Sequence, residues 1–70
     1  MERIAVESRE IAVVGYAEET STLEVTFRRG GVYRYREVPS GVYRQLMEAP
    51  SLGTFFAQQI KDRYPYEKVH

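Results

Sequence analysis

The sequence has no cysteine and only one histidine, His70, at its C-terminal end. Disulfide bonds, thiolate metal sites and sites built from several histidines are therefore excluded, and we expect neither a metal nor another cofactor. No apolar run approaches the roughly 20 residues of a membrane span, and the charged segment 1–10 lacks the apolar stretch of a signal peptide. These absences lead us to expect a soluble, cytoplasmic protein with no membrane partner.

Motifs of catalysis and of cofactor binding are also missing. The sequence contains no G-x-G-x-x-G, no P-loop, no G-x-S-x-G and no cysteine–histidine pair. The adjacent acids Glu18 and Glu19 stand in a polar segment that is more typical of a turn, because a catalytic carboxylate pair needs a buried group with a raised pKa. We therefore expect that the protein is not an enzyme.

The length of 70 residues predicts a single domain spanning residues 1–70. A chain this short buries only about 60% of its unfolded surface, so it has a small core and is marginally stable. Self-association is the usual stabilising device that the composition leaves open, and we expect a homo-oligomer. The aromatic residues support this expectation, because four tyrosines exceed what one small core can bury: Tyr16, Tyr43, Tyr64 and Tyr66.

Ten basic and ten acidic residues give a net charge of zero, which argues against strong non-specific DNA binding. The charges are unevenly distributed, however, because residues 28–44 contain a single acid, Glu37, among several arginines. Guanidinium groups bind phosphate and stack on bases. A solvated sheet surface is the alternative interpretation of this segment. Its arginines are Arg28, Arg29, Arg34, Arg36 and Arg44.

The first half of the chain has the pattern of β-strands. Residues 11–17 form a short apolar run, and residues 22–28 alternate between polar and apolar side chains, as in a half-buried strand. Gly30 and Gly31 predict a tight turn into a third strand at residues 32–38, which Pro39 ends. A short opening strand at residues 4–6 is weakly indicated.

The second half has the pattern of helices. Ser40 is predicted to cap a helix at residues 41–49 that Pro50 ends, and Ser51 is predicted to cap a second helix from residue 52 to about residue 63. Strands followed by helices indicate an α+β fold, an antiparallel meander of three to four strands followed by two helices packed on one face. We expect one core made of Leu23, Val25, Phe27, Leu46, Phe55, Phe56 and Ile60.

Strand alternation predicts which side chains share a face. Tyr33 and Tyr35 are expected to point toward the core, because the opposite arrangement would bury Arg34 and Arg36 at high cost. The arginines would then project from the open face beside Arg28, with Glu24 as the single nearby acid.

Two groups of residues suggest ligand binding. In the first, Tyr33 and Tyr35 alternate with Arg34 and Arg36, and Tyr43 and Arg44 follow nearby. Aromatic rings that stack on bases, together with guanidinium groups for phosphate, are typical of a nucleotide or single-strand platform, although such tyrosines can also be half-buried core residues.

The second group is the helix start formed by residues 51–54. Free backbone N–H groups make such a start a potential anion site, and Gly53 would permit close approach of a phosphate. The alternative is that Ser51 is an ordinary N-cap.

The sequence resembles the KTSC domain over about residues 6–66. The family occurs at the C-terminus of some lysyl-tRNA synthetases and as small stand-alone proteins of bacteria and phages. Its hallmark is a central Y-x-Y. Basic residues are common around its Ser-x-Gly-x turn, but this chain has Leu52 and Thr54 at those positions. This difference weakens the case for phosphate binding at the turn. The resemblance implies no established activity, although the synthetase context suggests RNA binding. It rests on these positions: Ser8, Ile11, Val14-Gly15-Tyr16, Leu23-Glu24-Val25-Thr26-Phe27, Val32-Tyr33-Arg34-Tyr35, Val38-Pro39, Val42-Tyr43, Leu46, Ala49-Pro50-Ser51-Leu52-Gly53-Thr54-Phe55-Phe56, Ile60 and Tyr64-Pro65.

From these features we expect a small non-catalytic binding module for RNA or a nucleotide. The alternative is a homo-oligomeric interaction protein, including a phage-type protein that sequesters a cyclic nucleotide signal. The candidate ligand-binding residues are Arg28, Arg34, Arg36, Tyr33, Tyr35, Tyr43, Arg44, Ser51 and Gly53.

Overall fold

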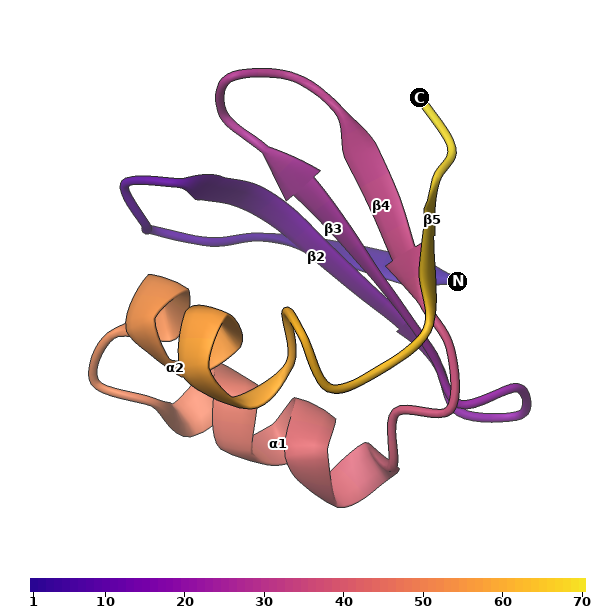
Figure 1. Cartoon of the computed structure of the whole chain (residues 1–70). Helices are drawn as coiled ribbons and strands as arrows, with labels where there is room; N and C mark the ends of the chain where they lie inside the picture. Colours follow the sequence, from indigo (N-terminus) through magenta and orange to yellow (C-terminus); the bar gives the residue numbers. More distant parts are fainter.

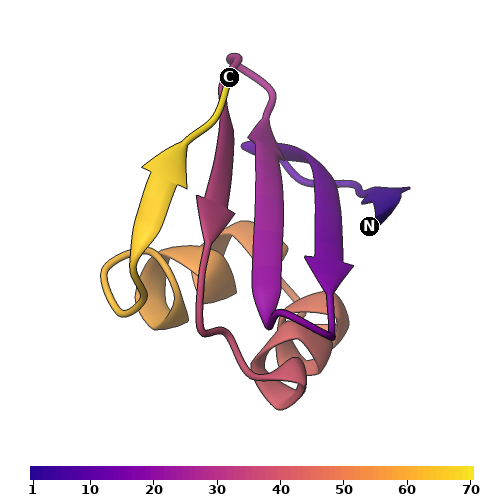
Figure 2. The same cartoon turned by 90° about the vertical axis from the view of Figure 1, so that its right-hand side faces the viewer.

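A computed structural model describes all residues 1–70 as one antiparallel sheet with two helices (Figure 1). The strand order in the sheet is β1-β2-β3-β4-β5, and every neighbouring pair is antiparallel. Both helices lie on the same side of the sheet, as the two views in Figures 1 and 2 show. The predicted α+β fold is therefore confirmed. The elements are β1 (Glu2–Ala5), β2 (Ile11–Ala17), β3 (Thr22–Phe27), β4 (Val32–Tyr35), α1 (Ser40–Glu48), α2 (Leu52–Gln59) and β5 (Tyr66–Lys68).

The sheet has five strands, where the sequence predicts three to four. The weakly indicated opening strand is present as β1, and the chain returns after α2 to add β5 beside β4. Sequence patterning does not reveal β5, because its three residues are all exposed and show no alternation. Backbone pairing with β4 forms this strand, in the register Tyr33↔Lys68 and Tyr35↔Tyr66.

Two of the predicted strands extend further than the observed strands. The third strand ends at Tyr35 and not at residue 38, because Glu37 has a φ of 61° and cannot continue an extended strand. The glycine turn is confirmed, since Gly30 and Gly31 have φ values of 109° and 95°, which side chains other than glycine rarely adopt. β3 ends at Phe27, one residue before the predicted end.

The helix starts differ from the predictions at one of two places. Ser40 is not the cap of α1, because Pro39 holds that position and no side chain caps the helix, so this prediction is wrong. Ser51 does cap α2, since its Oγ accepts a hydrogen bond from the backbone N–H of Thr54 at 3.4 Å. The second helix ends at Gln59 instead of near residue 63. Neither helix has the length and apolar character that a membrane crossing requires.

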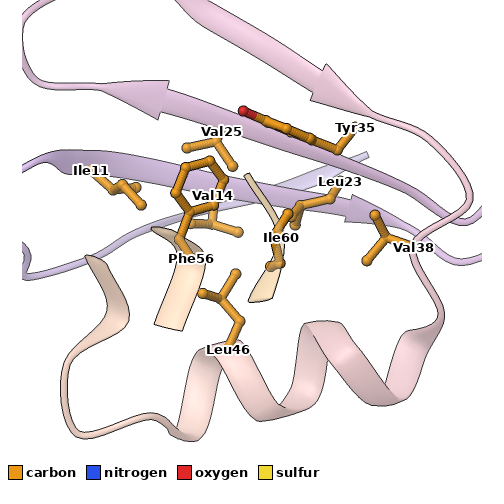
Figure 3. Packing of buried hydrophobic residues seen from close by; sticks show 9 residues of the cluster. All are labelled: Ile11, Val14, Leu23, Val25, Tyr35, Val38, Leu46, Phe56 and Ile60. Atoms are coloured by element: carbon orange, nitrogen blue, oxygen red, sulfur yellow. The ribbon is translucent and has the colours of Figure 1, made fainter. Parts of the chain in front are cut away.

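The core fills the space between the sheet and the two helices (Figure 3). Five of the seven predicted core residues are members of it. Phe27 and Phe55 are exceptions, because they are half-buried and pack against the core from outside. Its nine members are Ile11, Val14, Leu23, Val25, Tyr35, Val38, Leu46, Phe56 and Ile60.

Candidate functional site

One row of residues crosses the sheet on the face opposite the helices, with one residue from each strand. The strand registers align them as Arg3, Gly15, Glu24, Arg34 and Glu67. The Glu24 carboxylate is only 5% exposed, and it accepts hydrogen bonds from the Nε atoms of Arg3 at 2.8 Å and of Arg34 at 2.9 Å. Arg34 therefore lies beside Glu24 as alternation predicts, but its charge is already compensated inside the chain.

Gly15 makes this arrangement possible, because it has no side chain between Arg3 and Glu24. A Cβ at Gly15 would stand 3.2 Å from Cγ of Arg3 and 2.8 Å from Sδ of Met1. The hydrogen bond from Arg3 is the main reason that the pKa of Glu24 lies below its ordinary value; the charge of Arg34 acts in the same direction, and burial acts against it. Glu24 is thus a charged group that holds three strands together.

Two of the three arginines that the sequence places on the open face, Arg28 and Arg34, make contacts inside the chain. The Arg28 guanidinium donates hydrogen bonds to the backbone carbonyl oxygens of Ser8 and of Val6, the latter at 2.9 Å, so it secures the loop between β1 and β2. Arg36 is exposed, and its side chain has no ion-pair partner. Because Arg28 and Arg34 make contacts inside the chain, they are poor candidates for binding a phosphate.

Tyr43 and Arg44 also lie away from Arg34, since α1 covers the opposite face of the sheet. The Tyr43 ring stacks on Tyr16 with a centroid distance of 4.6 Å, and the Tyr16 hydroxyl donates a hydrogen bond to the carbonyl oxygen of Val38 at 2.6 Å. Both Tyr43 and Arg44 line a shallow depression of about 390 Å³ beside β1. They therefore do not form one site with Arg34, although the sequence groups them with it.

A larger cleft of about 720 Å³ lies on the helix side of the sheet, between β4, β5 and α2. We call it the aromatic cleft. Its volume is within the usual range of small-molecule sites, about 300–1,000 Å³. Five aromatic side chains line it: Phe27, Tyr33, Tyr35, Phe56 and Tyr66.

The aromatic rings of the cleft contact one another and leave one ring accessible. The Tyr35 ring centroid lies 5.3 Å from that of Phe56 and 5.3 Å from that of Tyr66. Burial, more than the nearby charges, raises the pKa of Tyr35 to about 12. Tyr66 is 54% exposed, so a planar ligand can reach its ring. From the sequence, Tyr66 is expected only to be one of the tyrosines in excess of the core.

Charged side chains surround the aromatic cleft, and none of them has an ion-pair partner in the chain. The two ion pairs of the molecule both belong to Glu24, on the other face. Two acids and three bases are therefore available to a ligand. They are Glu10, Asp62, Arg9, Arg29 and Lys61.

The predicted anion site at the start of α2 is partly occupied by the protein itself. Ser51 caps the helix and also donates a hydrogen bond from its Oγ to Oγ1 of Thr54 at 3.0 Å. Gly53 lines the aromatic cleft, but a carboxylate oxygen of Glu10 lies 3.8 Å from the position that a Gly53 Cβ would take. The Glu10 carboxylate disfavours a phosphate bound at Gly53, in the first turn of α2.

Of the nine candidate residues, the aromatic cleft thus includes Tyr33, Tyr35 and Gly53. The model of the KTSC domain family matches residues 7–64. The chain belongs to the KTSC domain family. This confirms the resemblance drawn from the Y-x-Y segment and its surroundings.

Relatives of this KTSC domain occur both alone and within larger proteins. An uncharacterised protein of Stutzerimonas stutzeri (strain A1501) is 42% identical over 70 residues, which cover 99% of each chain. A lysine–tRNA ligase of Trichormus variabilis is 41% identical over 54 residues, but these are 77% of this chain and only 10% of the ligase. The crystal structure of a KTSC domain protein from Yersinia pestis superposes with a TM-score of 0.95 at 35% identity, covering 99% of this chain and 97% of the other.

Proposed function

We propose that this KTSC domain is a non-catalytic binding module for RNA or a nucleotide, and that the aromatic cleft is its binding site. One observation carries the proposal: five charged side chains without ion-pair partners surround a cleft lined by five aromatic rings. An aromatic ring stacks on a base of any sequence, and arginine or lysine binds the phosphate beside it. The cleft offers both kinds of group within the space of a small ligand.

The energies favour a ligand that uses the rings and the charges together. Stacking of one base on an aromatic side chain contributes about 1–3 kcal/mol. The cations are exposed, so salt would screen a phosphate contact that they made alone. The net charge of zero adds no long-range attraction for a long polyanion. A nucleotide or a short single-stranded RNA segment suits this site better than a duplex.

The family context supports the same proposal. Segments similar to this chain occur in lysine–tRNA ligases of Trichormus variabilis and Nostoc punctiforme. A ligase that handles a tRNA is a protein in which an additional RNA-binding segment would be useful. This chain matches only 10% of each ligase, so the ligase activity is not carried over to it.

The test is a calorimetric titration with nucleoside monophosphates, cyclic dinucleotides and short single-stranded RNA. Arg29 and Arg36 form a matched pair, because both are exposed and without ion pairs but only Arg29 lines the cleft. Arg29→Ala should weaken binding about tenfold, or about 1.4 kcal/mol, while Arg36→Ala should leave it unchanged. Tyr66→Ala should also weaken binding, because it removes the accessible ring.

Two results would contradict the proposal. If none of these ligands binds the wild-type domain, the cleft is not a nucleotide site. If Arg36→Ala weakens binding as much as Arg29→Ala, the ligand lies on another surface.

A homo-oligomer remains a second candidate, and one observation favours it. Every residue of the edge strands β1 and β5 is exposed, and each strand has one unpaired edge that can pair with a strand of another copy. The surplus of tyrosines is a weaker argument than the sequence suggests, because Tyr16 and Tyr43 stack on each other within one copy. Light scattering that gives a dimer mass or higher at high micromolar concentration would support the candidate, and the monomer mass would contradict it.

A further inference from the structure

Asp62 is the acid of the aromatic cleft that stands four residues before Tyr66 in the chain. It follows α2, lines the cleft, is exposed and has no ion-pair partner. Its charge lies close enough to the Tyr35 hydroxyl to contribute to the raised pKa of that group. A base stacked on the rings would therefore meet the Asp62 carboxylate at its edge.

Glu10, the other acid of the cleft, lies at the opposite end of α2. Its carboxylate is close to Gly53, in the first turn of the helix, whereas Asp62 comes after the last residue, Gln59. The eight residues of α2 separate these ends by about 12 Å. Glu10 and Asp62 therefore cannot contact the same base edge.

The cation Arg29 lies at the other end of β4 from Tyr35. Arg29 stands in the turn that precedes β4, and Tyr35 is the last residue of this strand. Four residues of strand span about 13 Å, and Tyr33 lies between the two ends on the same face. This is roughly the distance from the outer edge of a purine to its 5′-phosphate, so base and phosphate can be bound at the two ends of one cleft.

An ionised carboxylate only accepts hydrogen bonds. Guanine presents two adjacent N–H groups, at N1 and at the 2-amino group, which match the two carboxylate oxygens. Adenine, cytosine and uracil each present a ring-nitrogen or carbonyl acceptor within this edge, and such an acceptor would face the negative charge without a proton between them. A carboxylate at the base edge thus selects guanine.

We infer that the aromatic cleft binds a guanine nucleotide, with its base stacked on Tyr66, its N1–H and 2-amino groups donating to Asp62, and its phosphate near Arg29. This inference rests on the proposed function and narrows it to one base. The guanine can belong to a free nucleotide or to RNA, because both present the same edge and a phosphate.

The test compares the monophosphates of guanosine, adenosine, cytidine, uridine, inosine and xanthosine by calorimetric titration. Wild type should bind GMP at least tenfold more tightly than AMP, with IMP weaker than GMP because it lacks the 2-amino group. Asp62→Asn should weaken GMP binding at least tenfold and strengthen XMP binding, because an amide offers one donor and one acceptor to the N1–H and O2 of xanthine. Glu10→Gln is the matched control within the cleft and should keep the preference for GMP.

The results distinguish failure of the guanine preference from failure of the nucleotide site itself. Equal binding of all bases by wild type, or an unchanged preference in Asp62→Asn, overturns the guanine inference and leaves the nucleotide site standing. If only Glu10→Gln loses the preference for GMP, the base edge contacts Glu10 and not Asp62. This result also overturns the guanine inference. Binding of none of the nucleotides, nor of the trinucleotides GGG and AAA, overturns both the guanine inference and the nucleotide site. Tighter binding of GGG than of GMP supports the inference and identifies RNA as the source of the base.

Discussion

Replacement of Glu24 by glutamine tests whether the row across the open face stabilises the fold. Two charge-assisted hydrogen bonds would contribute about 1.5–3 kcal/mol each if both partners were buried. The side chains of Arg3 and Arg34 are 50% and 46% exposed, so solvent reduces each contribution toward the 0.2–1 kcal/mol of surface pairs. Glutamine keeps the size and part of the hydrogen bonding. We therefore expect Glu24→Gln to lower the free energy of unfolding by about 1–2 kcal/mol at pH 7, measured by urea denaturation.

The pH dependence gives the prediction a second, independent readout. The pKa of Glu24 is lower in the folded protein than its ordinary value of 4.5, so the carboxylate stabilises the fold above about pH 4.5 and loses this effect as the pH falls through the folded value. Wild type should lose more stability than Glu24→Gln between pH 7 and pH 3. Glu67→Gln is the control, because Glu67 occupies the same row but is exposed and has no ion pair. Equal effects of the two substitutions at both pH values would refute the structural role of Glu24.

Three further substitutions test the core and the sheet. Phe56→Ala should cost about 3–5 kcal/mol, which is comparable with the whole stability of a 70-residue domain, so a protein with unchanged thermal unfolding would show that this core is misassigned. Gly15→Ala should cost about 1 kcal/mol in urea denaturation, since its Cβ would displace Met1 and Arg3, and a neutral result would contradict the close approach. The raised pKa of Tyr35 means that wild type should lose stability between about pH 10 and 12, and a Tyr35→Phe protein with the same loss in this range would contradict the assignment.

The fold could be predicted where the chain alternates or repeats strongly. β2 and β3 follow from apolar and alternating segments. Both helices follow from their apolar spacing, and Pro50 marks the end of the first. β5 could not be predicted, because its residues bury nothing and the strand exists only through backbone pairing with β4. The position of that pairing depends on the path of the chain after α2, which no local pattern encodes.

The candidate site was predicted in part. The Y-x-Y segment predicts Tyr33 and Tyr35, which both line the cleft. The sequence places Phe56 in the core only, and it does not distinguish Arg29 from the other arginines of residues 28–44. Tyr66 joins the cleft only because β5 pairs with β4, so its role depended on the missed strand. Arg28 could not be excluded from the sequence, because the carbonyl oxygens that it contacts, those of Val6 and Ser8, are brought to it by the β1–β2 loop.

The Tyr33–Arg34–Tyr35 segment contributes to the aromatic cleft on one face of β4 and to the ion pair with Glu24 on the other face. Alternation turns both tyrosines to the aromatic cleft and turns Arg34 to the other face, where it pairs with Glu24. Arg34 thus stands between two tyrosines in the sequence, but its guanidinium does not lie between their rings. The cations that remain for a ligand come instead from loops and from the end of α2, where no acid pairs with them. If the proposed function is correct, Arg34→Ala should therefore weaken nucleotide binding only by destabilising the strand that presents the rings, whereas Arg29→Ala should weaken it directly.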